Sequence, residues 1–363
     1  MRFLFCESSS NLGGQELQIL LQMAALRQAG DASVLACRPN SGIAREAGAR
    51  GLDWRPVAFR NSLHLPSIAA LRTLIRAERI DVALCHSGHD ANNLAVAARL
   101  LRSRPLLIRA RTYQPGVPKA ISYNRLVDRT LVNSEHLRRR ILANPAIRPE
   151  RIAVLRPLVP LVDLRAQSRL PLPEPLAAVL RGRGPVIVQA AMLRREKGHR
   201  TVLEAIAGLR GRYPNLRYVI AGSGPEEAAL RKHAKHPRLQ DLVHFTGLLQ
   251  PVAPLLARAD LVIMPSLDEP LGLAQLEALA LGVPVAVSDA GGLPETVTHG
   301  ETGWILRAGD VAAWRDGMAD ALADPARARA MAQRGRSFVE ATFAPHAHLA
   351  ALNAELAKAR AAR

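Results

Sequence analysis

Short apolar runs alternate with longer amphipathic stretches along almost the whole chain of 363 residues. The apolar runs cover residues 3–6, 32–36, 82–85, 106–108 and 130–132 in the first half, and residues 186–189, 218–221, 243–245, 261–264, 285–288 and 304–306 in the second. Apolar residues at helical spacing fill the intervals, as at residues 16–28 and 67–77. Strands that alternate with helices indicate βαβ units and parallel sheets. We therefore expect an α/β protein in which each half forms its own doubly wound sheet.

Six prolines between residues 156 and 185 separate the two halves. Apolar periodicity is poor there, so we interpret this stretch as the connection between two domains. A chain of this length with 48% hydrophobic residues can bury two cores. We expect a first domain at residues 1–165, a second at residues 166–340, and a helical, basic segment at residues 341–363.

The formal net charge is +18 and comes mostly from arginine. Nucleic acid, an anionic membrane surface and phosphorylated substrates could each use this charge. Aromatic residues make up only 4% and no nucleic-acid-binding motif is present, which argues against nucleic acid. Basic clusters such as residues 99–104 and 138–140 are either solvated surface or contacts for anionic lipid or a phosphorylated acceptor.

No apolar run approaches the ~20 residues that span a bilayer, and the apolar run at residues 3–6 is too short for a secretory signal. We therefore expect a cytoplasmic protein, with peripheral contact at the inner face of the cytoplasmic membrane as an extension of that expectation. Cys6, Cys37 and Cys85 each lie in or beside a strand-like run. Buried reduced thiols are expected there rather than a disulfide or a metal site.

The stretch of residues 265–285 places Glu269 and Glu277 eight positions apart around a Pro-Leu-Gly turn. A strand-like run ends before the turn, and helical spacing begins after it. Unpaired N–H groups at a helix start, together with the helix dipole, favour an anion there. Two carboxylates beside an anion need a purpose of their own, and hydrogen bonding to the hydroxyls of a sugar supplies one.

This string resembles the E-x7-E signature of family 4 glycosyltransferases, which are retaining enzymes of the GT-B architecture. The likeness continues through residues 283–285, 291–295 and 300–303. It implies two Rossmann-like domains that face a cleft, with the acceptor bound mostly by the first and the nucleotide-sugar donor by the second, and a C-terminal helix that packs back on the first domain. It also implies that Glu269 contacts the donor sugar and that Glu277 holds the ribose hydroxyls. The backbone of Leu271, Gly272 and Leu273 would then approach the sugar and the diphosphate.

Arg194, Arg195 and Lys197 follow the first strand-like run of the second half. Cations beyond the carboxyl end of a parallel strand are well placed to stabilise a leaving diphosphate. The segment resembles the family's G-R-L-x-x-x-K-G block, and Lys197 matches its lysine. Met192 stands where the family has its arginine, so Arg194 or Arg195 is expected to take that role.

His86 ends a strand-like run of the first half, where ligand-facing residues gather. It matches the family's strand-end histidine, which contacts the donor sugar or diphosphate, and it completes an expected catalytic set with Glu269 and Lys197. His89 and Asp90 lie close by in sequence. This trio lacks a further ligand and the chain lacks a D-x-D motif, so we expect no metal and no other cofactor.

Glycine-rich turns supply the remaining donor-binding candidates. Gly13 and Gly14 precede the first helical stretch and resemble the family's G-G-x-E loop, which lies over the donor site. Gly222 and Gly224 resemble its G-x-G-P turn near the nucleotide, although a purely fold-forming turn is an alternative for both.

These features predict a retaining glycosyltransferase that moves a sugar from a nucleotide-sugar donor to an acceptor hydroxyl. Arg111 and Tyr113 follow a first-half strand and are candidates for acceptor contact. Basic charge and similarity to bacterial surface-polysaccharide transferases suggest a glycan or lipid-linked acceptor, as in lipopolysaccharide biosynthesis. A nucleotide-sugar epimerase of the same fold and a degenerate homologue that only binds sugar nucleotides remain alternatives. The nucleotide base, the sugar, the linkage, the acceptor and the oligomeric state stay open.

Overall fold

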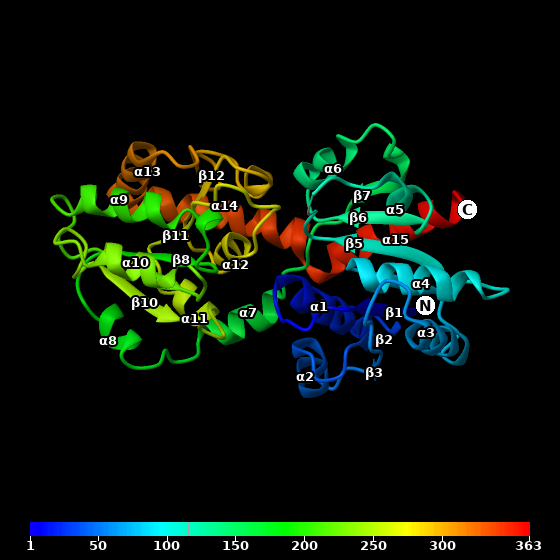
Figure 1. Cartoon of the computed structure of the whole chain (residues 1–363). Helices are drawn as coiled ribbons and strands as arrows, with labels where there is room; N and C mark the ends of the chain where they lie inside the picture. Colours follow the sequence, from blue (N-terminus) through cyan, green and yellow to red (C-terminus); the bar gives the residue numbers. More distant parts are fainter. Residues whose placement is uncertain (115) are drawn as a thin grey trace. The chain divides into compact units, whose positions relative to one another are not determined.

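The computed structural model describes residues 1–114 and 116–363 (Figure 1). These residues form two compact units, one of Met1–Leu158 with Pro345–Arg363 and one of Val159–Ala344. Each unit is built on one parallel sheet with helices packed against both faces. The expected α/β class with two doubly wound sheets is therefore confirmed.

The described strands of the first unit form a seven-stranded parallel sheet in the order β3-β2-β1-β4-β5-β6-β7. The strands are β1 (Arg2–Glu7), β2 (Ala32–Cys37), β3 (Trp54–Pro56), β4 (Val82–Cys85), β5 (Leu106–Arg111), β6 (Arg129–Val132) and β7 (Ile152–Val154). The helices are α1 (Gly14–Gln28), α2 (Gly42–Ala49), α3 (Leu65–Ala77), α4 (Gly88–Arg99), α5 (Ala120–Asn124), α6 (Glu135–Leu142) and α15 (Pro345–Ala361), with a 3₁₀ turn η1 (Pro149–Arg151). Side chains of α1, α2 and α15 cover one face of the sheet, and those of α3 and α4 cover the other.

The second unit has a six-stranded parallel sheet in the order β10-β9-β8-β11-β12-β13. The strands are β8 (Val186–Ala190), β9 (Arg217–Ala221), β10 (Val243–Gly247), β11 (Leu261–Met264), β12 (Val285–Ser288) and β13 (Trp304–Leu306). The helices are α7 (Leu161–Ser168), α8 (Leu176–Leu180), α9 (His199–Leu209), α10 (Glu227–Ala234), α11 (Ala253–Leu256), α12 (Ala274–Ala280), α13 (Val311–Ala323) and α14 (Pro325–Phe343), with 3₁₀ turns η2 (Arg195–Lys197) and η3 (Leu293–Glu295). Helices α9 and α13 pack on one face, whereas α7, α11 and α12 pack on the other.

The central strands read as continuous apolar runs because both of their faces are covered. Every residue of β4 and β11 is buried, as expected for parallel strands between two layers of helices. Cys6 in β1, Cys37 in β2 and Cys85 in β4 are buried and free, as expected from the sequence.

The boundaries between the units differ from those drawn from the sequence. They fall after Leu158 and after Ala344 rather than at residues 165 and 340. The reason lies in two helices of the second unit: α7 packs against α11, and α14 continues to Phe343 before a proline starts α15. The proline-rich connection therefore contains α7 and α8, each of which begins directly after a proline, Pro160 and Pro175.

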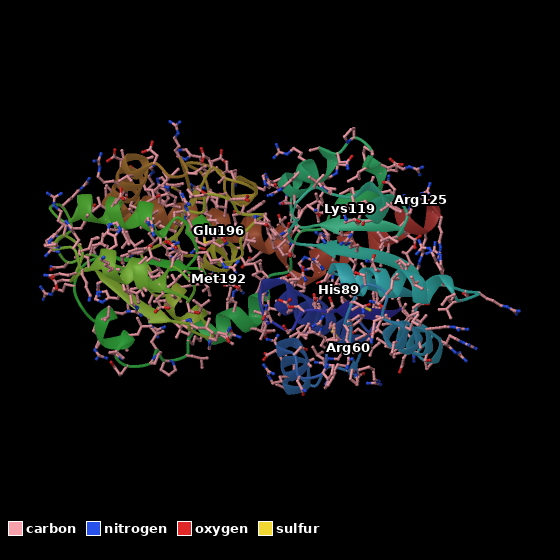
Figure 2. All side chains as sticks on the ribbon, viewed as in Figure 1. Arg60, His89, Lys119, Arg125, Met192 and Glu196 are labelled. Carbon is pink, nitrogen blue, oxygen red and sulfur yellow. The ribbon has the colours of Figure 1, made fainter. Side chains whose placement is uncertain are left out.

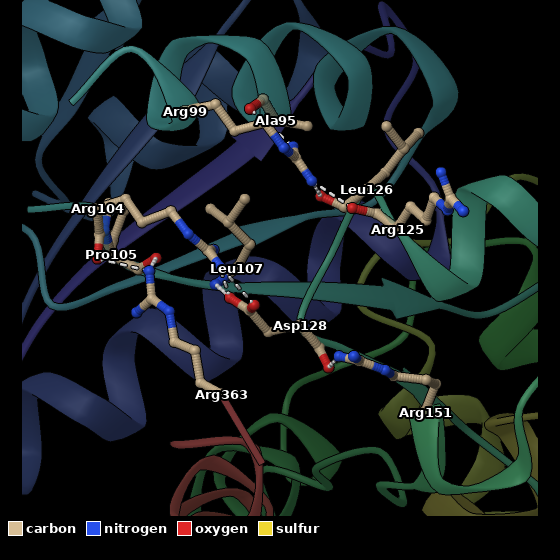
Figure 3. Close-up of polar contacts among 10 residues, drawn as sticks. All are labelled: Ala95, Arg99, Arg104, Pro105, Leu107, Arg125, Leu126, Asp128, Arg151 and Arg363. Carbon is tan, nitrogen blue, oxygen red and sulfur yellow. Dashed lines mark hydrogen bonds and ion pairs between the residues drawn. The ribbon is translucent and has the colours of Figure 1, made fainter. Parts of the chain in front are cut away.

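The C-terminal helix α15 belongs to the first unit, where it contacts α1 and β5. Arg129 pairs with Glu355 of this helix at 2.5 Å. Figure 3 shows how the end of the chain is held: the Arg363 guanidinium donates to the Arg104 carbonyl at 3.0 Å, and Arg104 itself forms a two-pronged ion pair with Asp128 at 2.8 Å. In the part of the chain that the structure describes, every helix is too short or too polar to span a membrane.

Candidate functional site

The candidate site residues of the second unit gather at the point where the order of its strands reverses. β8 and β11 are neighbours, while β9 and β10 extend the sheet on one side and β12 and β13 on the other. Open α/β sheets bind ligands outside the carboxyl ends of their strands at such a switch point. Lys197 lies in the loop after β8, and Glu269 lies in the loop after β11.

Lys197 and Glu269 contact each other directly. The Nζ atom of Lys197 lies 2.5 Å from Oε2 of Glu269, and both side chains are mostly buried. The Ser266 hydroxyl donates to the same carboxylate oxygen at 3.3 Å. The site therefore holds a cation and a carboxylate side by side, and little of either side chain is accessible to water.

Two glycines allow the loops to approach at positions where no side chain fits. Gly198 has φ +71°, and a Cβ there would lie 1.9 Å from the Pro265 carbonyl oxygen. Gly291 has φ +63°, and its Cβ would lie 2.0 Å from the Glu269 carbonyl oxygen. The N–H of Gly292 donates to that oxygen at 2.8 Å. A side chain at either glycine would displace the ion pair.

Buried polar residues inside the strands hold these loops, and the sequence patterns above did not predict them. The Gln189 amide on β8 donates to the Lys197 carbonyl at 2.8 Å, and its oxygen accepts from the Tyr218 hydroxyl. The Ser288 hydroxyl on β12 donates to the Ser266 carbonyl at 2.5 Å. Buried polar groups need such partners. A lone polar residue within an otherwise apolar strand is the signal that points to both.

The turn at Leu271, Gly272 and Leu273 is shaped by Gln275, a further residue missed from the sequence. Gly272 has φ +83°, and a Cβ there would lie 2.6 Å from Oε1 of Gln275. The Gln275 amide donates to the Leu271 carbonyl at 2.8 Å and to the Thr296 hydroxyl at 3.3 Å. Gln275 is fully buried, so it positions the turn from the inside.

Glu277 lies on α12, two residues beyond Gln275, and the residue as a whole is half-buried. Its carboxyl end is shielded from water, and this desolvation raises its pKa to about 7. A shielded carboxylate gains by accepting hydrogen bonds from hydroxyl groups, which donate without bringing a charge of their own.

The two arginine candidates near Lys197 are at the surface, and so is Met192, which stands at the position of the family's arginine. Met192 is 50% exposed (Figure 2), and Arg194 and Arg195 are exposed as well. The Arg194 guanidinium lies 3.9 Å from the Glu196 carboxylate. Neither arginine bonds to Glu269, so the substitution of one of them for the family arginine stays a prediction.

Gly222 and Gly224 pack tightly against the loop after β8. A Cβ at Gly222, where φ is +149°, would lie 2.0 Å from the Ala191 carbonyl oxygen, and a Cβ at Gly224 would lie 2.5 Å from that of Leu193. The space beside both glycines is thus filled by backbone. This packing supports the fold-forming interpretation, while donor contact at these glycines stays a prediction.

The first unit has its own switch point between β1 and β4. His86 follows β4 and is buried, with Nδ1 2.9 Å from the Cys6 carbonyl oxygen. Because a carbonyl only accepts, Nδ1 is the donor of this hydrogen bond and carries a proton. The Phe5 ring stacks on His86 with centroids 6.3 Å apart.

Glu7, His86 and Asp90 offer ligand atoms within 4.8 Å of one another. Burial raises the pKa of both carboxyl groups. Glu7 accepts from the Ser9 N–H, the Gln15 amide and the Ser87 hydroxyl, and Asp90 accepts from the N–H groups of His86, Ser87 and Ala91. Every carboxylate oxygen therefore accepts from at least one donor, so the three residues belong to one hydrogen-bond network, and the absence of a metal stays a prediction.

The other candidates of the first unit lie in different surroundings. Gly13 and Gly14 are exposed at the start of α1, where the Gly13 N–H donates to the Glu16 carboxylate at 2.8 Å. Arg111 is 9% exposed and lines a cavity of about 70 Å³ together with His86. Burial and the neighbouring Arg109 lower the pKa of Arg111. Tyr113 is 54% exposed and does not line this cavity.

Comparison with known families gives one answer for both units. Residues 177–338 match the family described as Glycosyl transferases group 1, and residues 12–162 match Glycosyltransferase Family 4. The chain belongs to the family 4 glycosyltransferases. Glu269, Glu277 and Lys197 all fall within the first of these matches, and His86 falls within the second.

Relatives of this family 4 chain include the GDP-mannose-dependent alpha-(1-6)-phosphatidylinositol monomannoside mannosyltransferase of Mycolicibacterium smegmatis, which is 39% identical over 164 residues that cover 43% of each chain. A glycosyltransferase from Rickettsia africae has a TM-score of 0.83 at 17% identity, with 98% of both chains covered. HepE from Anabaena in complex with UDP has a TM-score of 0.81 at 18% identity, with 98% of this chain and 100% of that chain covered. The match spans less than half the length of the curated relative. The structural likenesses show the GT-B fold.

Proposed function

We propose that this chain is a retaining glycosyltransferase that transfers a sugar from a nucleotide sugar to an acceptor hydroxyl. The observation that carries the proposal is the 2.5 Å pair of Lys197 and Glu269 at the switch point of the second sheet. The shielded carboxylate of Glu277 lies on the helix that follows. A cation for the diphosphate and two carboxylates for sugar and ribose hydroxyls match the parts of a nucleotide sugar.

The proposed reaction exchanges one bond at the anomeric carbon for another on the same face. The bond to the diphosphate oxygen breaks, the bond to the acceptor oxygen forms, and the acceptor proton passes to the leaving diphosphate. Lys197 stabilises the negative charge that develops on the diphosphate. Glu269 accepts hydrogen bonds from sugar hydroxyls and orients the ring. His86 stays the predicted donor contact of the first unit. The charge stabilisation is assigned to Lys197, to Arg194 or Arg195 and to backbone amides, without a metal ion.

The substrates are proposed from the chemistry of the site together with the relatives. The mycobacterial relative is named for GDP-mannose and a phosphatidylinositol mannoside, and HepE was crystallised with UDP. Both names support a nucleotide donor, and they differ in its base. We place the chain in cell-surface glycan biosynthesis, with a glycan or lipid-linked acceptor such as a lipopolysaccharide core, and at the cytoplasmic side of the membrane.

The two alternatives make different products. An epimerase returns a nucleotide sugar with one inverted centre, and a degenerate homologue returns the donor unchanged. Family membership of both units favours transfer over epimerisation. A released nucleoside diphosphate together with a glycosylated product would exclude both alternatives.

The direct test is a thermal-shift panel of UDP, GDP, ADP and their sugars, because a bound donor raises the melting temperature by mass action. With the donor identified, Glu277→Ala should weaken nucleotide binding, whereas Glu269→Ala should mainly reduce turnover. Glu204→Ala, at an exposed position on α9, is the matched control and should change neither. Unaltered donor affinity and unaltered rate in both site variants would contradict the assignment.

A further inference from the structure

Two large apolar side chains project from the first unit around α5. Val117, in the loop before this helix, is 82% exposed, which is the highest value among the large apolar residues that the structure describes, and Ile121 is 61% exposed. Tyr123 on the same short helix is buried with Leu137 and Ile141. The helix is thus anchored from below while Ile121 faces out. Val117 and Ile121 are four positions apart in the sequence, and two exposed apolar side chains of this size in one short segment indicate a contact surface.

Exposed cations lie in the same and the neighbouring segments of the chain as these apolar residues. Lys119 and Arg125 cap the two ends of α5 (Figure 2), and Arg139 and Arg148 lie on and beyond α6. All four are exposed, and no described residue pairs with their side chains. Figure 3 shows the Arg125 side chain pointing away from Arg99, to which only its carbonyl is bonded. Residues 117–148 contain seven Lys or Arg and two Asp or Glu, a net charge of +5.

Backbone and amide contacts join these segments into one surface. The Asn144 amide beyond α6 donates to the Pro118 carbonyl at 2.8 Å. The Asn124 amide of α5 donates to the Ala146 carbonyl at 2.7 Å, and its oxygen accepts from the Arg148 N–H at 3.0 Å. The loop before α5 and the loop after α6 are therefore fixed side by side. We call residues 117–148 the α5–α6 surface.

We propose that the α5–α6 surface docks this protein on an anionic lipid membrane. Val117 and Ile121 would enter the boundary between headgroups and acyl chains, and the surrounding cations would contact lipid phosphates. A nucleic acid would use the cations but would leave both aliphatic side chains without a partner, whereas a lipid surface engages both. The proposal rests on the proposed function for its purpose, since docking there brings the enzyme to a lipid-linked acceptor.

The test is co-sedimentation of the full chain with vesicles of phosphatidylcholine alone or with added phosphatidylglycerol. Each basic residue near an anionic surface contributes roughly fivefold to partitioning. We expect at least about tenfold stronger binding to the anionic vesicles, weakened by added salt because salt screens the charges.

Two variants separate the apolar and the charged contribution. Val117→Ser with Ile121→Ser should lower the partition coefficient on anionic vesicles about tenfold. Lys119→Gln with Arg125→Gln should lower it about 25-fold and flatten its salt dependence. All four positions are exposed, so the variants should fold.

Matched controls come from exposed positions of the second unit. Val162→Ser with Leu248→Ser removes two apolar side chains that are 79% and 71% exposed, and Arg183→Gln with Arg329→Gln removes two exposed cations. These variants should bind vesicles within about twofold of the unmodified protein.

Donor hydrolysis, measured on the same proteins without vesicles, keeps the two proposals apart. It should be unchanged in all four variants. Two outcomes would overturn the docking surface and leave the transferase proposal standing. One is a protein that hydrolyses the donor but does not bind anionic vesicles; the other is vesicle binding that falls equally in the α5–α6 variants and in the controls. Vesicle binding by a protein that turns over no nucleotide sugar would overturn the transferase instead.

Discussion

Lys197 and Glu269 lie 72 positions apart in the sequence, and their side chains meet at 2.5 Å in the second unit. The approach depends on Gly198 and Gly291, where any side chain would strike the backbone of the opposite loop. A diphosphate that binds Lys197 has to compete with the Glu269 carboxylate. Under the proposed function, its binding would release that carboxylate for a sugar hydroxyl, and the pair would then link recognition of the diphosphate to recognition of the sugar.

Lys197→Met should lower the free energy of unfolding of the second unit by about 2–4 kcal/mol, because breaking a mostly buried ion pair leaves one charge unpaired. Among the described residues, Glu269 would keep the Ser266 hydroxyl as its one side-chain partner. Urea unfolding followed by the fluorescence of the buried Trp304 and Trp314, in a Trp54→Phe background, measures the change.

A second substitution identifies the cause. Glu269→Gln added to Lys197→Met removes the orphaned charge and should restore part of the lost stability. Arg195→Met removes an exposed cation nearby and should shift the unfolding free energy by no more than about 0.5 kcal/mol. If the double variant were less stable than Lys197→Met alone, the ion pair would not be the reason.

Much of the fold is predictable because helices cover both faces of each sheet, which leaves the strands as unbroken apolar runs. The strands that escaped prediction are β3 and β7, each three residues long at a sheet edge. β3 reads Trp-Arg-Pro with two exposed residues, so it shows no apolar run. Helices α7 and α8 escaped because prolines precede them, and the same prolines that break an apolar pattern are compatible with a first helical turn.

The sequence pointed to the charged candidates of the site, and it did not point to the residues that act on the backbone. Glu269 and Lys197 were candidates because charge in a strand-to-helix loop is conspicuous, and Glu277 was a candidate because it follows Glu269 by eight positions; the structure brings Lys197 and Glu269 together. Gln189 and Gln275 were missed because each acts by bonding to a carbonyl of a loop. Sequence spacing does not show which loop a strand or helix will support.

Nucleotide binding should release up to about one proton near pH 6.5 through Glu277. Desolvation raises the pKa of this carboxyl from 4.5 to about 7, and hydrogen bonds from ribose hydroxyls favour the ionised form. Without a ligand, the folded protein keeps a proton on Glu277 over a pH range in which the unfolded chain has already lost it. The stability that this proton contributes is fully present below pH 4.5 and is lost as the pH rises through 7. Calorimetry in buffers of different ionisation enthalpy measures the proton count. Glu277→Gln should abolish the release and Glu204→Gln should not; equal release in both would refute the role.

His199 should make the second unit sensitive to acid. It begins α9 with both ring nitrogens buried and unpartnered among the described residues, and burial, with a smaller effect of Lys197, lowers its pKa from 6.5 to about 4. The unfolded chain binds this proton first, so stability present above pH 6.5 is lost as the pH falls towards 4, by about 3 kcal/mol in all.

Replacement of this histidine tests the argument. His199→Leu should flatten the dependence of unfolding free energy on pH between 6.5 and 4, with little loss at pH 7.5 because no hydrogen bond is broken. His236→Gln, at an exposed position of the same unit, should keep the full dependence. Parallel pH profiles for unmodified protein and His199→Leu would show that other groups control the acid transition.

Gly272→Ala should weaken donor binding about 10- to 100-fold through the shape of the turn before α12. Two effects act there: φ is +83°, which strains any L side chain, and the new Cβ would lie 2.6 Å from the buried Gln275.

Gly300→Ala isolates the first effect, because its φ is +76° and nothing lies within 4 Å of the place that its Cβ would take. Both variants should lose about 1 kcal/mol of stability to backbone strain. Only Gly272→Ala should also reduce the thermal shift caused by the nucleotide sugar, because only there must Gln275 move and carry the turn with it. A normal donor shift in Gly272→Ala would mean that the ligand does not read the backbone of this turn.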